Sequence, residues 1–159
     1  MMNYMDYAIE EGIKALEKGE IPIGAIIVKD GIIIGRGHNK KESSNDPTAH
    51  AEIIAIKDAC KTIGDWRLNG SEMYVTLEPC PMCTGAILQS RLSKLHIGTF
   101  NKDMGACGSV VNLVDNRSLN TFVNTIWMYD DRCSDLLKEF FKRRRKEYKN
   151  IRIQKERWE

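Results

Sequence analysis

Hydrophobic residues at the start of the chain follow a helical spacing and then change to a denser, strand-like pattern. The spacing over residues 3–18 predicts an amphipathic helix that ends near Gly19. The apolar positions of this helix are Met5, Ala8, Ile9, Ile13 and Leu16. Two β-branched runs follow at 23–29 and 32–37, separated by Asp30-Gly31. Asp-Gly between such runs is typical of a hairpin with a type I′ turn.

The rest of the chain alternates between helical and strand patterns. In order, the patterns predict a polar loop over 39–47, a helix over 48–62, a strand over 73–77, a helix over about 81–91, a strand over 94–99, a Gly-containing loop over 101–109 and a long helix over about 131–149. Either Thr48 or Asp46 is the N-cap of the second helix, and Pro81 suits the first position of the third. This order predicts an α/β fold, a three-layer α/β/α sandwich with one mixed sheet and helices on both faces.

Length and composition predict one domain, residues 1–159, in the cytoplasm. A chain of 159 residues fits one domain, and 42% hydrophobic with 29% charged residues is typical of a globular protein. The apolar runs are far shorter than the roughly 18 residues that suggest a membrane span, and no secretory signal precedes them, so no membrane contact is expected. Five cysteines, an odd number, argue against a disulfide framework and for a reducing compartment.

The near-neutral net charge conceals a basic carboxyl-terminal end. Residues 138–159 carry ten basic and four acidic side chains, a charge of +6, which leaves −4 for residues 1–137. Such asymmetry indicates a surface for a polyanion, and Arg143, Arg144 and Arg145 are its candidate RNA-binding residues. A solvated helix face is the alternative interpretation.

A Cys-x-x-Cys motif stands where a predicted strand meets a predicted helix. Cys80 and Cys83 would project from the same side of the first helical turn, where free N–H groups favour the thiolate. A redox pair is one interpretation of this motif. A structural zinc site is a second, with Cys107 or Cys133 as the fourth ligand. A catalytic zinc site with three protein ligands and a water is the third.

The upstream segment Thr48-Ala49-His50-Ala51-Glu52 favours the catalytic zinc site. His-x-Glu followed by Pro-Cys-x-x-Cys is the signature of zinc nucleobase deaminases. In that interpretation His50 is the third ligand, and Glu52 is a catalytic acid and base that does not bind the metal. An ideal helix would direct these two side chains about 200° apart, so the arrangement requires a helix end. The other histidines, His38 and His96, are expected to have structural roles.

Residues 5–149 resemble the bacterial tRNA-specific adenosine deaminases of the cytidine deaminase superfamily. The segments that carry the resemblance are Ile21-Pro22-Ile23-Gly24-Ala25, Gly37-His38-Asn39, Asp46-Pro47 with the His-x-Glu segment, Tyr74 to Cys83, Gly105-Ala106-Cys107-Gly108-Ser109 and Phe140-Phe141. The resemblance implies a cytidine deaminase-like five-stranded sheet, a homodimer and one zinc ion per chain, bound by His50, Cys80 and Cys83. It also implies that Glu52 transfers protons and that Asn39 hydrogen-bonds a flipped purine.

The implied reaction is hydrolytic deamination of adenosine to inosine at wobble position 34 of a tRNA anticodon stem-loop. The enzyme would be a hydrolase acting on an amidine C–N bond. Two departures concern the RNA-facing region. Asn101 occupies the place of an acid that meets the ribose 2′-OH in the family, and Thr121-Phe122 replaces a common His-Arg pair. A deaminase of free guanine, cytosine or their nucleotides is the alternative enzyme, and a catalytically silent zinc-binding module is the alternative class. Glu52 favours an enzyme, and the basic end favours RNA.

Overall fold

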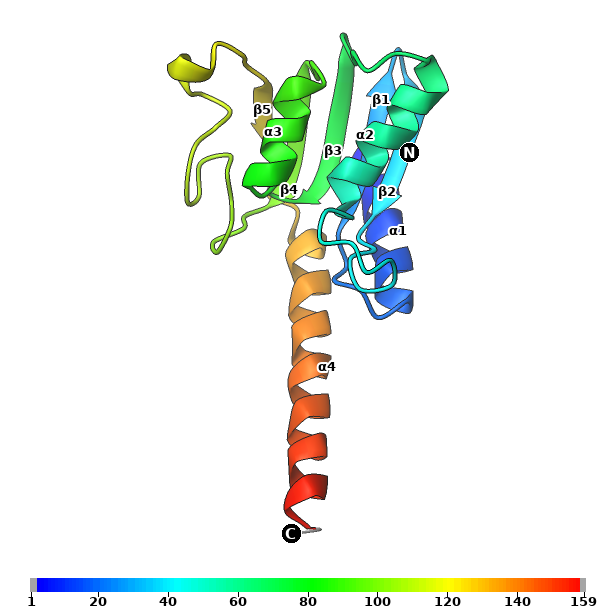
Figure 1. Cartoon of the computed structure of the whole chain (residues 1–159), viewed down its shortest axis with the longest axis vertical. Helices are drawn as coiled ribbons and strands as arrows, with labels where there is room; N and C mark the ends of the chain where they lie inside the picture. The colour runs from blue at the N-terminus through cyan, green and yellow to red at the C-terminus, as the bar shows by residue number, and fades with distance from the viewer. Residues whose placement is uncertain (1–2, 158–159) are drawn as a thin grey trace.

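A five-stranded sheet with the order β2-β1-β3-β4-β5 forms the middle layer of the computed structural model, which describes residues 3–157 (Figure 1). Its strands are β1 (Gly24–Lys29), β2 (Ile32–His38), β3 (Ser71–Leu77), β4 (Lys94–Thr99) and β5 (Asn124–Trp127). β1 pairs antiparallel with β2 and β3, whereas β3, β4 and β5 run parallel. The sheet is therefore mixed, as predicted.

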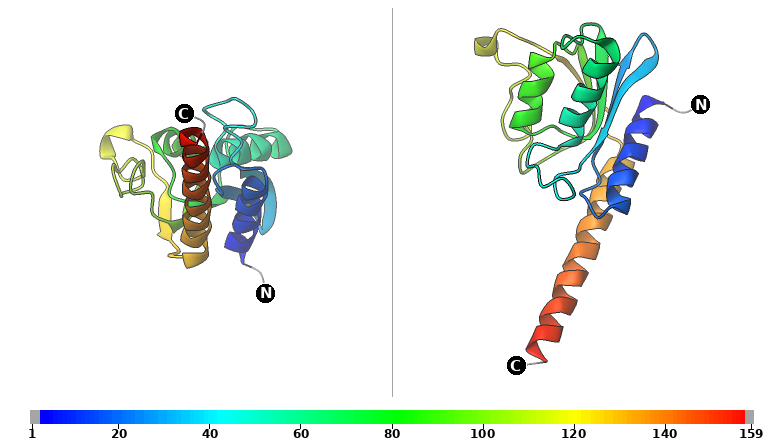
Figure 2. Two further views of the ribbon diagram at one scale, coloured as in Figure 1. Left: turned by 90° about the horizontal axis from the view of Figure 1, so that it is seen from below. Right: turned by 45° about the vertical axis from the view of Figure 1, so that its right-hand side comes forward.

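Helices cover both faces of this sheet (Figure 2). The helices are α1 (Tyr4–Glu17), α2 (Ala51–Ile63), α3 (Pro81–Gln89) and α4 (Asp131–Glu156), with a short 3-10 helix at Arg117–Leu119. α2 and α3 share a buried apolar cluster with one face, and α1 and the first turns of α4 share a second cluster with the other. The three-layer α/β/α architecture is confirmed.

The amino-terminal elements form for the expected local reasons. Asn3 caps α1 by accepting from the backbone N–H of Asp6, whose side chain accepts from the N–H of Asn3 in return. At the hairpin, Asp30 and Gly31 both have positive φ angles, 49° and 77°, which is the requirement of a type I′ turn. The predicted hairpin is therefore confirmed together with its turn.

Two glycines let β2 lie directly against α2. A Cβ added at Gly37 would lie 2.3 Å from the carbonyl oxygen of Ala51, and one at Gly35 would lie 2.4 Å from that of Ala55. No side chain fits at such distances. The first turn of α2 is thus seated on the carboxyl-terminal half of β2, which places the helix start at the edge of the sheet.

The start of α2 differs from the prediction. Its N-cap is His50, with φ −81° and ψ 153° and no side-chain capping bond, so neither Thr48 nor Asp46 caps the helix. Asp46 instead accepts hydrogen bonds from the N–H and the hydroxyl of Thr48, and these hold a turn before the helix. His50 is therefore outside the helical turns, and its ring direction is not set by helical periodicity.

The carboxyl-terminal part contains two features beyond the predicted pattern. β5 has only four residues, all half-buried or exposed, and hydrogen bonding to β4 defines it. α4 runs to Glu156 rather than ending near residue 149. It projects from the edge of the sheet at which β3 and β4 end (Figure 1). Among the described residues no helix combines the length and the apolar character that a membrane crossing requires.

The loop after β4 is organised around a buried carboxylate. Glu78, 1% exposed, accepts hydrogen bonds from the backbone N–H groups of Asn101, Cys107 and Ser109 and from the hydroxyl of Ser109. Gly105 makes room for this carboxylate, since a Cβ there would lie 2.5 Å from its Oε2 atom. Residues 101–109 are therefore fastened to the end of β3.

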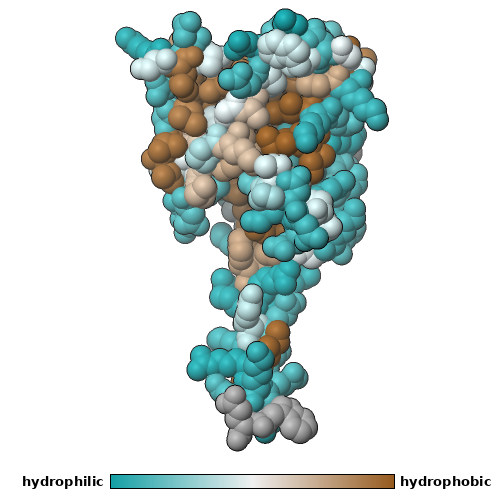
Figure 3. All heavy atoms as spheres, in the orientation of Figure 1, coloured by the Kyte–Doolittle hydropathy of each residue, from teal (hydrophilic) through white to brown (hydrophobic). Residues whose placement is uncertain are grey.

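Exposed apolar side chains follow the connection between β4 and β5. They are Phe100, Met104, Val110, Val111, Leu119 and Phe122. Brown side chains gather on the side of the molecule where this connection runs (Figure 3).

We expect Gly37→Ala to lower the free energy of unfolding by about 1–3 kcal/mol, because the added methyl group overpacks the β2–α2 contact. Gly85→Ala is the matched control, since no atom lies within 4 Å of its added Cβ. Inside a helix this second change should be neutral or stabilising. Urea denaturation of both variants tests the prediction, and equal stabilities would contradict it.

Glu78→Gln should also destabilise the protein, by about 1–3 kcal/mol. The substitution replaces one carboxylate oxygen with an NH2 group, which cannot accept a hydrogen bond, so a buried backbone N–H is left without its acceptor. Glu72→Gln, in the first half of β3, which ends just before Glu78, serves as the control. Glu72 is 30% exposed and pairs with Lys94 and His96 at the surface, so its loss should cost less than about 1 kcal/mol. Thermal and urea unfolding measure both; an equal loss in the two variants would argue against the role given to Glu78.

Candidate metal centre

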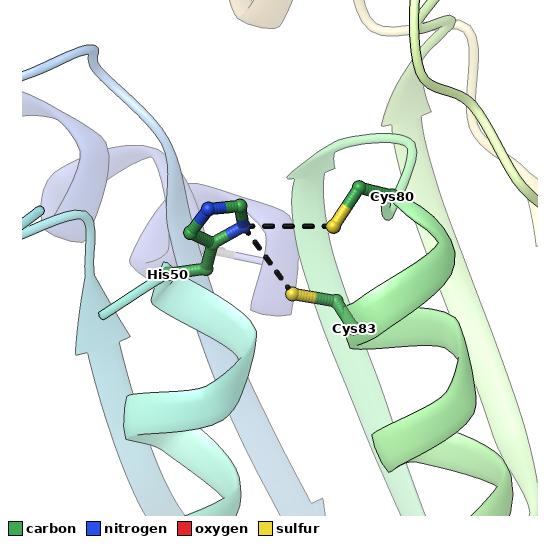
Figure 4. Close-up of side chains that lie close together, drawn as sticks. All are labelled: His50, Cys80 and Cys83. Atoms are coloured by element: carbon green, nitrogen blue, oxygen red, sulfur yellow. Dashed lines mark hydrogen bonds between the residues drawn. The ribbon is translucent and has the colours of Figure 1, made fainter. Parts of the chain in front are cut away.

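Three predicted metal ligands come together at the edge of the sheet. The Nδ1 atom of His50 lies 3.6 Å from the Sγ atom of Cys80 and 3.5 Å from that of Cys83. Figure 4 shows the imidazole and both sulfurs pointing toward one another from the starts of α2 and α3. We call these side chains the His–Cys–Cys cluster.

The geometry of the His–Cys–Cys cluster suits a zinc ion. With Zn–S of about 2.3 Å and Zn–N of about 2.0–2.1 Å, a nitrogen and a sulfur in a tetrahedral site lie about 3.6 Å apart. The two nitrogen–sulfur separations, 3.5 and 3.6 Å, match this value. Cys83 is fully buried, whereas His50 and Cys80 are partly accessible. Three ligands, two of them partly accessible to solvent, could hold a metal and leave a fourth position for a water.

The start of α3 prepares the two thiols for metal binding. Cys80 is the N-cap and Pro81 takes the first helical position, as predicted. A hydrogen bond from the Cys83 thiol, with further help from backbone N–H groups and His50, lowers the pKa of Cys80 to about 5. That hydrogen bond and burial raise the pKa of Cys83. One thiolate is therefore available near neutral pH, and metal binding would displace the second proton.

Glu52 lies beside the cluster as the second residue of α2. It is 4% exposed, and burial, with a contribution from Cys80, raises its pKa to about 7. Such a carboxyl can both accept and release a proton near neutral pH. Because His50 precedes the helix, its imidazole and the Glu52 carboxyl reach the same place despite their spacing. The requirement for a helix end, inferred from the sequence, is met.

Asn39 lies buried at the end of β2, close to the His50 segment. It is 6% exposed, and its Oδ1 accepts from the N–H of Lys41 at 3.2 Å. The next residue, Lys40, donates its N–H to the carbonyl of Ala49 at 3.0 Å. Asn39 is thus held next to the start of α2, where a substrate contact remains a prediction.

Glu20 is a buried carboxylate that the sequence analysis missed. It is 1% exposed and accepts from the N–H groups of Glu42 and Ser43, at 3.2 and 2.6 Å. It therefore fixes the loop after Asn39, as Glu78 fixes the loop after β4. Neither glutamate stands in a recognisable pattern, because its partners lie 22 to 31 positions away.

Asn101 follows β4, and its amide is engaged within its own loop. Oδ1 accepts from the N–H groups of Asp103 and Met104 at 3.3 and 3.0 Å, and Nδ2 donates to the carbonyl of Glu78 at 3.5 Å. A ribose contact by Asn101 remains a prediction, and it would compete with these bonds.

The other cysteines lie outside the His–Cys–Cys cluster. Cys107 is buried and lies 3.6 Å from the hydroxyl of Thr84, and buried Cys133 packs against Gly98. Over residues 3–157, the group of side chains able to hold a metal comprises the three predicted ligands and neither of these thiols. The structure therefore does not favour a structural four-ligand site.

The two remaining histidines have structural partners, as predicted. His38 lies 3.0 Å from the carboxylate of Glu11, and both residues are buried. His96 lies 2.7 Å from Glu72 and stacks on Tyr74 with ring centroids 4.0 Å apart.

The three candidate RNA-binding arginines are not equivalent. Arg143 pairs with Glu139 at 2.9 Å along α4. Arg144 donates to the carbonyl of Gly19 at 2.8 Å and so ties α4 to the end of α1. Arg145 is exposed, like every side chain from residue 141 to 157. A polyanion would meet the outer face of the helix, at Arg145, more readily than Arg144.

Comparisons with solved structures find the same architecture in deaminases. A structure from a study of A-to-I editing by tRNA:A34 deaminases at the wobble position aligns with 84% of this chain and 98% of its own, with a TM-score of 0.81 and 37% identity. A guanine deaminase from Bacillus subtilis aligns with 64% of this chain and 68% of its own, with a TM-score of 0.61 and 42% identity.

Sequence comparisons extend over more of the chain. A family model for MafB19-like deaminases matches residues 1–145. The tRNA-specific adenosine deaminase of Bacillus subtilis is 44% identical over 94% of this chain and 93% of its own. That of Aquifex aeolicus is 46% identical over 89% and 94%, respectively. These matches show that the chain belongs to the deaminase family of the bacterial tRNA-specific adenosine deaminases.

Proposed function

We propose that this protein is a zinc-dependent hydrolase that converts adenosine to inosine at wobble position 34 of a tRNA anticodon stem-loop. The observation that carries the proposal is the His–Cys–Cys cluster with a buried carboxyl, Glu52, beside it. Three ligands leave room for a reactant, and a buried acid outside the ligand set supplies proton transfer.

His50, Cys80 and Cys83 would hold one zinc ion per chain. Bound there, zinc would act as a Lewis acid and bring the pKa of a coordinated water toward neutrality. The start of α3 favours the anionic form of Cys80, and the buried position of Cys83 keeps competing water from that side of the site.

Glu52 moves the protons of the reaction. Its carboxylate takes a proton from the attacking water and delivers it to N1 of the purine as the water oxygen bonds to C6. It then passes the proton of the added hydroxyl to the amino group, so that the C6–N bond breaks, ammonia leaves and the C6 carbonyl forms. Water and adenosine thus give inosine and ammonia, and Glu52 ends in its starting state. Proton transfer by a positioned group contributes about 10²–10⁴-fold to a rate.

Asn39 and Asn101 are the proposed substrate contacts. The buried Asn39 amide would hydrogen-bond the flipped purine, and burial makes such a bond selective because an unmatched base would leave a polar group unpaired. Asn101 would meet the ribose, at the end of the loop that Glu78 holds.

RNA is favoured over a free base by two observations. The tRNA-specific relatives are 44% and 46% identical over about nine-tenths of the chain, whereas one guanine deaminase structure covers 86% of the chain at 22% identity and another is 42% identical over 64% of it. α4 also presents a basic outer surface at the edge of the sheet that carries the His–Cys–Cys cluster. Deamination of guanine or another free base remains the second candidate function, because the guanine deaminase structure from Bacillus subtilis is 42% identical to the aligned part of this chain.

The assembly and location are part of the proposal. Of the exposed apolar side chains between β4 and β5, those from Met104 to Phe122 suit a homodimer contact. A tRNA substrate and five free thiols, among the described residues, suit the cytoplasm. One deaminase domain would comprise residues 1–159, of which 1–2 and 158–159 lie outside the described residues.

Deamination itself is tested by mass analysis of nucleosides from anticodon stem-loops incubated with the protein. We expect inosine to appear in stem-loops with adenosine at the wobble position and not in those with guanosine there. Free guanine, adenine and cytosine are assayed in parallel. Turnover of a free base with no inosine in the RNA would contradict the proposal.

Glu52→Ala should retain about one zinc per chain and lose almost all deamination, because it removes a proton carrier and no ligand. Cys83→Ala should lose both metal and activity, whereas Cys60→Ala, a cysteine outside the cluster, should keep both. Elemental analysis and inosine formation measure the two properties. Loss of metal by a folded Glu52→Ala variant would make Glu52 a ligand and refute its assigned role.

Replacing Arg143, Arg144 and Arg145 together with Gln should weaken stem-loop binding and reduce the slope of log K against log[salt]. The reduction should be about two units if all three contact phosphates of single-stranded RNA. The control replaces Lys29 and Lys61, which lie at the end of the molecule away from the His–Cys–Cys cluster. If the slope of log K against log[salt] were unchanged in the arginine variant, these arginines would not contact RNA phosphates and would simply form a solvated helix face.

A further inference from the structure

Three aromatic rings gather where β4 and β5 end. Phe100 and Trp127 stack with centroids 4.8 Å apart and planes inclined by 29°. Tyr129 lies 6.3 Å from Trp127, at 24°, and 5.6 Å from Phe100. Phe100 is 53% exposed and Tyr129 is 65% exposed. We call these three rings the aromatic shelf.

The backbone holds the aromatic shelf in place. Trp127 packs against the core, and the N–H groups of Met128 and Asp130 donate to carbonyls of β4 at 2.8 and 2.9 Å. Tyr129 between them has φ 49°, a left-handed conformation that costs a bulky residue about 1–2 kcal/mol. The surrounding hydrogen bonds maintain this conformation, so an exposed ring is presented at a local energetic cost.

The aromatic shelf adjoins the His–Cys–Cys cluster through β3. The residues on either side of Phe100 are both bonded to Glu78: the Glu78 N–H donates to Thr99 O at 2.9 Å, and the Asn101 N–H donates to a Glu78 carboxylate oxygen at 3.1 Å. Glu78 is two residues before Cys80. Adjacent strands are about 4.8 Å apart, so the shelf and the metal ligands belong to one edge of the sheet.

A flat, unpaired base is the partner that this surface fits. An adenosine that reaches the cluster must leave its stack, which exposes a face of the neighbouring base. Exposed aromatic rings in a fixed stack can replace that lost neighbour. Two exposed rings provide far less than the roughly 800 Å² per partner of a stable protein interface. Asn101 and Lys102 also border the shelf with polar groups.

We propose that the aromatic shelf stacks a base adjacent to the target adenosine in single-stranded RNA, an inference that rests on the function proposed above. Phe100 is the ring next to the loop of Asn101, and Tyr129 extends the surface outward. The shelf thereby makes the nucleotide beside the target part of what the protein recognises.

The test measures stem-loop binding with Phe100→Ala and Phe100→Trp, both in the Glu52→Ala background so that bound RNA is not converted. Phe100→Ala should raise Kd by about 5- to 150-fold, which corresponds to the 1–3 kcal/mol of one stacked base. Phe100→Trp should keep the affinity. Tyr129→Asn, which tolerates the left-handed backbone, should weaken binding as well. Trp66→Ala, an exposed ring beyond the end of α2, should have no effect.

Stem-loops with an abasic site on either side of the target identify the stacked base. One abasic stem-loop should bind the protein that retains Phe100 more weakly than the intact stem-loop does. The Phe100→Ala variant should bind that abasic stem-loop and the intact one equally, because the abasic site and the substitution remove the same contact. Additive losses, or equal binding by Phe100→Ala, would overturn the proposal, whereas deamination by the unmodified protein would still uphold the proposed function. Dissociation of a dimer by Phe100→Ala, measured by sedimentation, would instead make the shelf a protein interface and refute it. Failure of the unmodified protein to bind or deaminate RNA would refute both.

Discussion

The hydrogen bonds to the buried Glu78 carboxylate hold the loop after β4 next to the segment that carries Cys80. Three backbone N–H groups and a hydroxyl from residues 101–109 converge on it. Buried amides without an acceptor would be costly, so the loop has one preferred position. Since Cys80 follows only two residues later, the position of the loop is set relative to the His–Cys–Cys cluster. The aromatic shelf begins at the same point, because Phe100 directly precedes the loop.

Three of the four buried glutamates among the described residues have two different roles near the His–Cys–Cys cluster. Glu20 and Glu78 each accept several backbone N–H groups and fix a loop beside the His–Cys–Cys cluster. Glu52 is equally buried, but desolvation dominates its surroundings and raises its pKa. The first two stabilise backbone, and the third is left able to exchange a proton. The number of backbone donors around a buried glutamate separates the two roles.

Local patterns in the sequence were sufficient to select the three side chains of the His–Cys–Cys cluster and to predict most elements. The hairpin follows from Asp30-Gly31, and the spacing of Cys80 and Cys83 follows from one helical turn. β5 is short and half-exposed, so its hydrogen bonds to β4 define it and its composition does not. The loop carboxylates Glu20 and Glu78 were missed for a related reason, since their donors come from distant segments. A sequence pattern depends on residues close together along the chain, whereas these hydrogen bonds join residues that are close only in the folded structure.

The outer half of α4 has consequences for how stability is distributed. Arg144 makes its contact with Gly19, and beyond it residues 145–156 are exposed and supported by local pairs such as Arg152–Glu156. Isolated helices of about this length are marginal in water. Unfolding these turns exposes little apolar surface, so we expect them to unfold at a lower free-energy cost than the sheet. Binding a polyanion to these turns would also require them to be helical, and the free energy of ordering them would reduce the net binding free energy. The affinity for a polyanion would then depend on the helix content of residues 145–156 as well as on their charge.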